Sequence, residues 1–199
     1  DNGIKFFDDD GFKLTDKMEE RIENLILTKK DKLPSPTHNK IGVSRDKKES
    51  ISKYIEHILS TVDEDLSGME VVLDCANGAA FETAPEIMKK LGVDLKVINN
   101  EPDGAKINVK CGSTYPQAAA EIVKKTGADI GIAHDGDADR VIIIDENGEI
   151  IDGDVIMAIC AADLLNRGKL KENTLVTTRY SNLGLREALK NRDGKVEIA

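Results

Sequence analysis

Between residues 71 and 144, short apolar runs rich in β-branched residues alternate with segments whose apolar residues recur at helical spacing. The strand-like runs cover residues 71–73, 95–98, 130–133 and 141–144, and the helical patterns cover residues 81–91 and 119–123. This alternation is typical of an open α/β sheet with helices on both faces. A turn dipeptide, Asn147 and Gly148, joins the last run to residues 149–151 and predicts an antiparallel hairpin. We therefore expect a three-layer α/β domain with a mixed sheet.

The segments on either side of this region show further strand and helix patterns. Before it, we expect a hairpin over residues 4–14, a helix over 18–26, a linker over 33–40 and a second helix over 51–59. After it, we expect a helix over residues 154–165, a strand over 174–178 and a helix over 185–189. The three-layer domain is therefore predicted to be flanked by parts of two other α/β domains.

An acidic turn lies between two of the predicted strands. Asp135, Asp137 and Asp139 occupy alternate positions after the run 130–133, and Arg140 directly follows them. In an extended loop, residues at every second position project to one side, so three carboxylates can converge on one ion. Mg²⁺ prefers oxygen ligands and keeps positions for water or phosphate oxygens, while a guanidinium can bind two phosphate oxygens. The turn therefore predicts a magnesium site that acts on a phosphoryl group.

Other kinds of acidic loop share parts of this pattern. A solvated turn between strands needs no metal ion. The calcium loop of an EF-hand has acids at similar intervals, but it requires glycine where Arg140 stands and helices where this sequence has β-branched runs. An aspartyl-phosphate phosphatase also places a nucleophilic aspartate at a strand end, with a second acid two residues later. The six residues from Asp135 to Arg140 leave that last alternative open.

The composition of the chain narrows the classes of partner. The 199 residues are 40% hydrophobic and 33% charged, which is sufficient for a buried core. A formal net charge of -9 disfavours nucleic acid as a partner. The sequence contains no apolar stretch of membrane-spanning length and no signal-peptide pattern, so we expect a cytoplasmic protein with no membrane partner. Cys75, Cys111 and Cys160 lack paired or metal-type spacing and fit unpaired thiols.

Five separated stretches resemble motifs of the α-D-phosphohexomutase superfamily, and within it the phosphoglucosamine mutase family, in the same order along the chain. They cover residues 1–7, 72–80, 102–114, 135–140 and 181–185. The acidic turn is similar to the magnesium loop of that superfamily. The resemblance extends over essentially the whole chain. It implies the end of a first domain at residues 1–40, a metal-binding second domain at 41–149, and the beginning of a third, sugar-recognising domain at 150–199.

The resemblance also implies roles for individual residues. Asp135, Asp137 and Asp139 would bind Mg²⁺, together with a phosphate oxygen of a phosphoserine. Arg140 would contact the phosphoserine or the transferring phosphoryl group, and Lys5 matches a family lysine that accepts a proton or stabilises charge there. His134 borders the acidic turn, but we expect it to be a packing residue.

The implied activity is the interconversion of glucosamine 6-phosphate and glucosamine 1-phosphate, through a phosphoserine and a sugar bisphosphate, for UDP-N-acetylglucosamine synthesis. A hexosamine phosphate is then the expected substrate. The chain contains no Ser-His-Asn-Pro run, which is the expected context of the catalytic serine. We therefore expect the 199 residues alone to be inactive. Two alternatives remain: a mutase of the same superfamily acting on mannose or glucose phosphates, and a non-catalytic metal-binding module.

Overall fold

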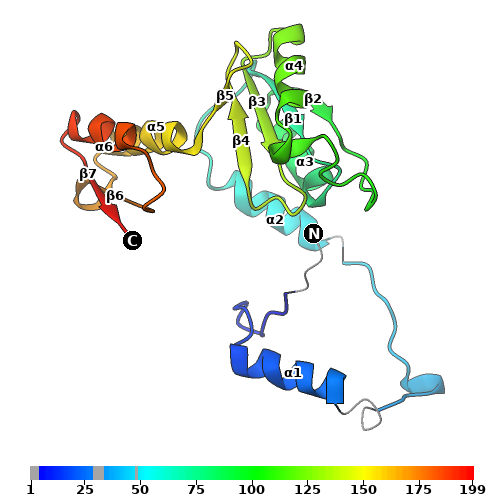
Figure 1. Cartoon of the computed structure of the whole chain (residues 1–199). Coiled ribbons are helices and arrows are strands. Elements are labelled where there is room, and N and C mark those ends of the chain that lie inside the picture. Colours follow the sequence, from blue (N-terminus) through cyan, green and yellow to red (C-terminus); the bar gives the residue numbers. More distant parts are fainter. Residues whose placement is uncertain (1–4, 29–33, 48) are drawn as a thin grey trace. The chain divides into compact units, whose positions relative to one another are not determined.

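The computed structural model describes residues 5–28, 34–47 and 49–199 (Figure 1). The chain divides into two units, Asp1–Glu49 and Ser50–Ala199, and each is described here by itself. Of the helices in the described residues, none is both long enough and apolar enough to cross a membrane.

The N-terminal unit has little buried structure. Phe7 and Lys13 form one antiparallel bridge, and the Asp8 side chain accepts a hydrogen bond of 2.9 Å from the backbone N–H of Phe12. The hairpin predicted over residues 4–14 is thus reduced to a bridged turn, and Ile4 lies outside the described residues. Helix α1 (Asp16–Thr28) confirms the next prediction. The predicted linker contains a short 3₁₀ helix, η2 (His38–Lys40), while Leu33 also lies outside the described residues.

A five-stranded mixed sheet forms the centre of the second unit. Its strands are β1 (Glu70–Asp74), β2 (Asp94–Ile98), β3 (Ile130–His134), β4 (Val141–Ile144) and β5 (Ile150–Ile151). The strand order is β2-β1-β3-β4-β5, with β1, β2 and β3 parallel and β4 and β5 antiparallel to their neighbours. The mixed sheet and its terminal hairpin confirm the prediction from the sequence.

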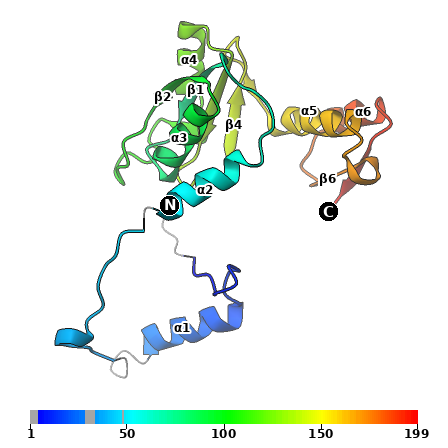
Figure 2. The same ribbon diagram turned by 180° about the vertical axis from the view of Figure 1, so that it is seen from behind.

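Helices cover both faces of this sheet (Figure 1, Figure 2). Helix α4 (Gln117–Thr126) packs on the face that includes Val72, and helix α3 (Thr83–Lys90) packs on the face that includes Leu73. Val72 and Leu73 are fully buried, and burying an aliphatic side chain of this size stabilises the fold by about 1.5–3 kcal/mol. Helix α2 (Glu49–Leu59) adds the buried Ile55. The three-layer α/β prediction is therefore confirmed.

Residues 153–198 form a smaller arrangement of two α-helices, a short 3₁₀ helix, η5 (Lys171–Asn173), and two strands. It contains helix α5 (Gly153–Asn166), strand β6 (Thr174–Thr177), helix α6 (Leu183–Lys190) and strand β7 (Lys195–Ile198). The two strands are parallel, and a small core centres on Ala161, Leu185 and Leu189. Strand β7 was not predicted from the sequence, because only Val196 and Ile198 mark it as apolar.

Candidate metal centre

The acidic turn lies at the carboxyl end of β3, the middle strand of the sheet, where open α/β sheets bind ligands. It is a tight turn rather than the extended loop that the sequence analysis assumed. The backbone N–H of Ala138 donates to the carbonyl oxygen of Asp135 at 3.1 Å, and Ala138 has a positive φ of 60°. The N–H of Asp135 donates across the turn to the Arg140 carbonyl at 3.3 Å. The hairpin between β3 and β4 therefore fixes the geometry of the acids.

The three aspartates converge despite this difference in backbone conformation. One carboxylate oxygen from each of Asp135, Asp137 and Asp139 lies within 4.8 Å of the other two. Asp135 is fully buried, whereas Asp137 and Asp139 are exposed. Within the described residues this is the one group of three potential metal ligands. Three carboxylates open to solvent on one side fit a hard dication that retains water or phosphate oxygens.

Arg140 binds the innermost of these carboxylates. Its Nη2 and Nε lie 2.6 Å and 2.8 Å from Oδ2 of Asp135, and its backbone N–H donates to Oδ1 at 3.0 Å. Burial alone raises the pKa of Asp135, but hydrogen bonds with the Arg140 backbone, the Asp137 side chain and the Arg140 side chain, together with the positive charge of Arg140, outweigh burial and hold that pKa below its ordinary value. Asp135 is therefore a carboxylate at neutral pH. The guanidinium remains largely exposed, so it can also meet an incoming anion.

A small cavity of about 290 Å³ lies beside Arg140. It is lined by Ser113, Thr114, Arg140, Val141 and Ile142. Ser113 and Thr114 belong to the 3₁₀ helix η4 (Gly112–Thr114), which the chain brings close to the acidic turn. The guanidinium and the Ser113 hydroxyl offer donors suited to a phosphate oxygen, whereas the Thr114 hydroxyl donates to the backbone carbonyl oxygen of Cys111 at 3.3 Å. Our sequence analysis gave these hydroxyl residues no role, although they follow a cysteine and a glycine within the stretch that carried the resemblance.

The other residues considered from the sequence have different surroundings. The structure brings together the three aspartates and Arg140. Lys5 is exposed and belongs to the N-terminal unit, so its role stays a prediction. Burial lowers the pKa of His134, whose Nδ1 is buried without a hydrogen-bond partner among the described residues. Burial and the charge of Asp74 raise the pKa of the Cys75 thiol to about 12, which makes it unreactive at neutral pH.

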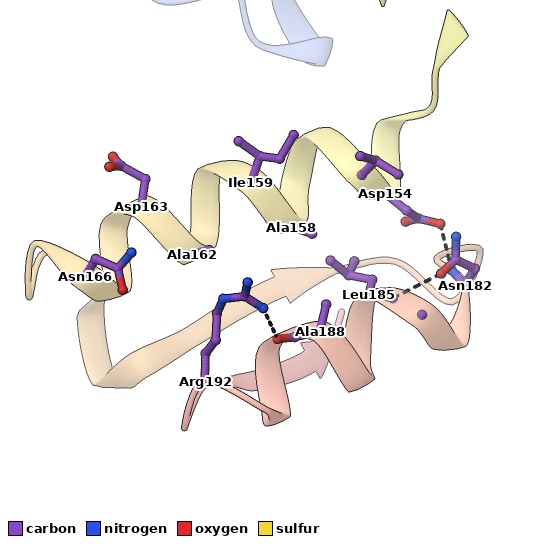
Figure 3. A pocket seen from close by; sticks show the side chains of 12 residues that line it. Asp154, Ala158, Ile159, Ala162, Asp163, Asn166, Asn182, Leu185, Ala188 and Arg192 are labelled. Carbon is purple, nitrogen blue, oxygen red and sulfur yellow. Dashed lines mark hydrogen bonds between the residues drawn. The ribbon is translucent and has the colours of Figure 1, made fainter. Parts of the chain in front are cut away.

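A larger cavity, of about 660 Å³, lies between α5 and α6 (Figure 3). Asp154 accepts a hydrogen bond of 2.8 Å from the backbone N–H of Asn182, and the Asn182 side chain caps α6 by accepting from the N–H of Leu185. Ala158 and Ile159 contribute apolar walls. Asp154 and Asn182 are thus engaged in hydrogen bonds at the start of α6. None of the residues that line this cavity belongs to the acidic turn.

Two family models match adjoining parts of the chain. Domain II of the phosphoglucomutase/phosphomannomutase family, an α/β/α domain, matches residues 52–148, and domain III of the same family matches residues 152–198. The first match contains strands β1 to β4 of the sheet and the acidic turn, and the second contains α5, β6, α6 and β7. Together they cover most of the chain.

Curated relatives and solved structures agree with these matches. The phosphoglucosamine mutase of Symbiobacterium thermophilum is 52% identical over 194 residues, which are 98% of this chain and 43% of that protein. The corresponding enzyme of Geotalea uraniireducens is 50% identical over 198 residues, covering 98% of this chain and 44% of the relative. The chain thus spans less than half the length of these relatives.

Among solved structures, a phosphoglucomutase/phosphomannomutase family protein from Burkholderia thailandensis has a TM-score of 0.68 at 20% identity, covering 92% of this chain and 38% of that one. An N-acetylglucosamine-phosphate mutase has a TM-score of 0.52 at 21% identity, covering 75% and 36% respectively. These likenesses support the fold. The two domain matches together cover more than half of the chain and show that it belongs to the phosphoglucomutase/phosphomannomutase family, and the relatives at about 50% identity show that it is similar to part of the phosphoglucosamine mutases.

Proposed function

We propose that this chain supplies the metal-binding part of the active site of a phosphoglucosamine mutase. The convergence of three aspartate oxygens at the carboxyl end of β3, beside the exposed guanidinium of Arg140, carries this proposal. Identity of about 50% to phosphoglucosamine mutases over nearly the whole chain supports the choice within the superfamily. The domain matches support the proposed second domain at residues 41–149 and the proposed beginning of a third at 150–199, and residues 1–40 are proposed to end a first domain.

In this proposal Asp135, Asp137 and Asp139 hold Mg²⁺. The ion supplies Lewis-acid stabilisation of a phosphoryl group. Arg140 offsets the negative charge that three carboxylates leave after one dication is bound, and it donates to a phosphoryl oxygen. Lys5 accepts a proton from the attacking sugar hydroxyl or stabilises charge there. Positioning and charge neutralisation account for most of the catalysis in such transfers.

The proposed reaction exchanges phosphoryl groups between a phosphoserine of the longer protein and the sugar. The serine ester bond breaks as a hydroxyl of glucosamine 6-phosphate bonds to the phosphorus, which forms a sugar bisphosphate. The serine then takes the other phosphoryl group and releases glucosamine 1-phosphate. The chain alone, which contains no Ser-His-Asn-Pro run, is expected to show no turnover.

A chimeric enzyme tests this function. The chain would replace the matching 194-residue segment of the Symbiobacterium thermophilum phosphoglucosamine mutase, and the conversion of glucosamine 6-phosphate would be measured with Mg²⁺. We expect turnover by the chimera and a loss of about 100-fold or more in Asp137→Asn, since a metal ligand contributes several kcal/mol to the transition state. Glu146→Gln alters an exposed acid in the next turn, so it is the matched control and should retain activity.

Two other functions remain as outcomes of the same assay. Faster turnover of mannose or glucose phosphates, when the same assay is applied to the complete protein, would assign the chain to a different mutase of the superfamily. A folded chimera that binds Mg²⁺ but turns over none of the three sugar phosphates would favour the metal-binding module. Full activity in Asp137→Asn would contradict the metal assignment itself.

A further inference from the structure

We propose that Asp74 is a positioning residue of the metal centre, and that its buried carboxylate holds two loops against the acidic turn. This inference rests on the proposed metal-binding function. Asp74 ends β1 and lies in register with Ala133 of β3, two residues before Asp135 of the acidic turn. Its side chain is fully buried. A buried carboxylate is costly unless it is hydrogen-bonded, and Asp74 accepts three hydrogen bonds, each from a different segment of the chain.

The first loop that Asp74 holds is the one that leaves β1. Oδ1 of Asp74 accepts from the backbone N–H of Ala76 at 2.9 Å, and Ala76 and Asn77 both have a positive φ near 50°, at 52° and 51°. This bend brings Gly78 against Gly136 in the acidic turn, where a Cβ on Gly78 would overlap the Gly136 carbonyl. The next residue, Ala79, donates its N–H to the same carbonyl oxygen at 2.8 Å. One side of the acidic turn is thus fixed by the bend at Asp74.

The second loop is the one that precedes η4. Oδ2 of Asp74 accepts from the backbone N–H of Gly112 at 2.9 Å. A Cβ on Gly112 would overlap the carbonyl oxygen of His134, so this loop packs directly on the residue before Asp135. Gly112 also begins the 3₁₀ helix that carries Ser113 and Thr114 beside Arg140. The same carboxylate therefore positions the other side of the acidic turn and the hydroxyl-lined cavity.

Asn99 joins Asp74 to the first loop by a separate route. The side-chain Nδ2 of Asn99 donates to Oδ2 of Asp74 at 3.0 Å, and the backbone carbonyl oxygen of Asn99 accepts from the backbone N–H of Asn77 at 2.7 Å. All three groups that face Asp74 are donors, so a carboxylate satisfies them, whereas an amide would turn its NH₂ toward at least one donor. Partners that orient metal ligands from outside the coordination sphere typically contribute about 10–100-fold to metal affinity.

Binding of Mn²⁺ to the 199-residue chain tests this inference, because free Mn²⁺ is measured directly by its electron paramagnetic resonance signal. We expect Asp74→Asn to weaken Mn²⁺ binding about 10-fold, at the lower end of the range for such partners. Asn99→Ala retains the Asp74 charge but removes one hydrogen bond, so we expect a loss of about three-fold, which is a fraction of that range. The matched control is Asp129→Asn, an exposed carboxylate that accepts from the Glu70 N–H at the opposite end of β1. It should bind Mn²⁺ as the unchanged chain does.

Each outcome has a distinct meaning, with folding followed by far-ultraviolet circular dichroism at the temperature of the titration. Unchanged Mn²⁺ affinity in folded Asp74→Asn would overturn the positioning role alone. A loss in Asp74→Asn with none in Asn99→Ala would assign the effect to charge and would also overturn it. If Asp74→Asn does not fold, Asn99→Ala decides the question. Absence of Mn²⁺ binding by the unchanged chain would instead overturn the metal assignment, and the inference with it.

Discussion

The five-stranded sheet and residues 153–198 differ in how they use apolar residues. In the sheet, helices cover both faces, and the middle residues of β1 are almost completely buried. Helix α5 is apolar around most of its circumference, yet Ala161 is its one fully buried residue, and Val155 and Ile159 are 44% and 59% exposed. Apolar composition therefore does not by itself indicate burial. The candidate metal centre lies on the sheet, the region with the larger buried core.

The largest effect that should separate the two regions is the cost of removing an aliphatic side chain. Leu73→Ala in β1 should lower the free energy of unfolding by about 2–5 kcal/mol, because a cavity remains at a fully buried site. Ile159→Ala in α5 should change it by about 0.5 kcal/mol or less. Urea denaturation followed by circular dichroism measures both changes. Equal costs at the two sites would contradict the comparison.

The sequence predicted the sheet region more completely than residues 153–198, because the two regions differ in the length of their apolar patterns. In the sheet, long apolar runs and helical periodicity are strong signals, and each predicted strand and helix was found there. Strand β7 was missed because alternation over four residues is a weak signal. The convergence of Asp135, Asp137 and Asp139 was predicted, but the left-handed Ala138 that produces it was not, since alanine rarely adopts that conformation.

The pairing of Arg140 with Asp135 and the role inferred for Asp74 required the structure. Arg140 is next to the acids in the sequence, but residue order does not show which carboxylate it binds. Asp74 depends on contacts with residues 99 and 112, which are distant in the chain. The sequence offered one signal for Asp74. This acid directly follows the apolar run 71–73, and it ends strand β1, which pairs with the strand that leads into the acidic turn. Lys5 belongs to the other unit, and its role stays a prediction.

A bound dication should stabilise the five-stranded sheet and leave the stability of residues 153–198 unchanged. At a Mg²⁺ concentration 100 times the dissociation constant, binding should add about 2.7 kcal/mol to the stability of the region that holds the site. Hydrogen exchange should therefore slow in β1, β3 and the acidic turn, and remain unchanged in α5 and α6. Asp137→Asn should abolish the difference. Slower exchange of equal size in both regions would show that they unfold together.

A smaller effect, on metal affinity, is expected from removing the positive charge of the Arg140 side chain beside the candidate metal centre. Arg140 lies within 2.6 Å of Asp135 and so competes with a bound metal ion for that carboxylate. Arg140→Gln should tighten Mn²⁺ binding roughly 15-fold, since a dication and a unit positive charge about 5 Å apart repel by about 1.7 kcal/mol in water. Arg140→Lys preserves the charge and is the control. Weaker binding in Arg140→Gln would show that the guanidinium holds Asp135 in its binding position.

The smallest effect should be a dependence of stability on pH that only the sheet region shows. Because the folded-state pKa of Asp135 lies below its ordinary value of 3.8, its charged form stabilises the folded state. That contribution is present above pH 3.8 and is lost as the pH falls through the lower folded-state pKa. The stability difference between the unchanged chain and Asp135→Asn, measured by urea denaturation without metal, should therefore shrink below pH 3.8. Ile159→Ala removes no titrating group, so its small effect on the free energy of unfolding should not vary over the same pH range. If the stability difference for Asp135→Asn is equally constant, Arg140 does not stabilise the charged carboxylate.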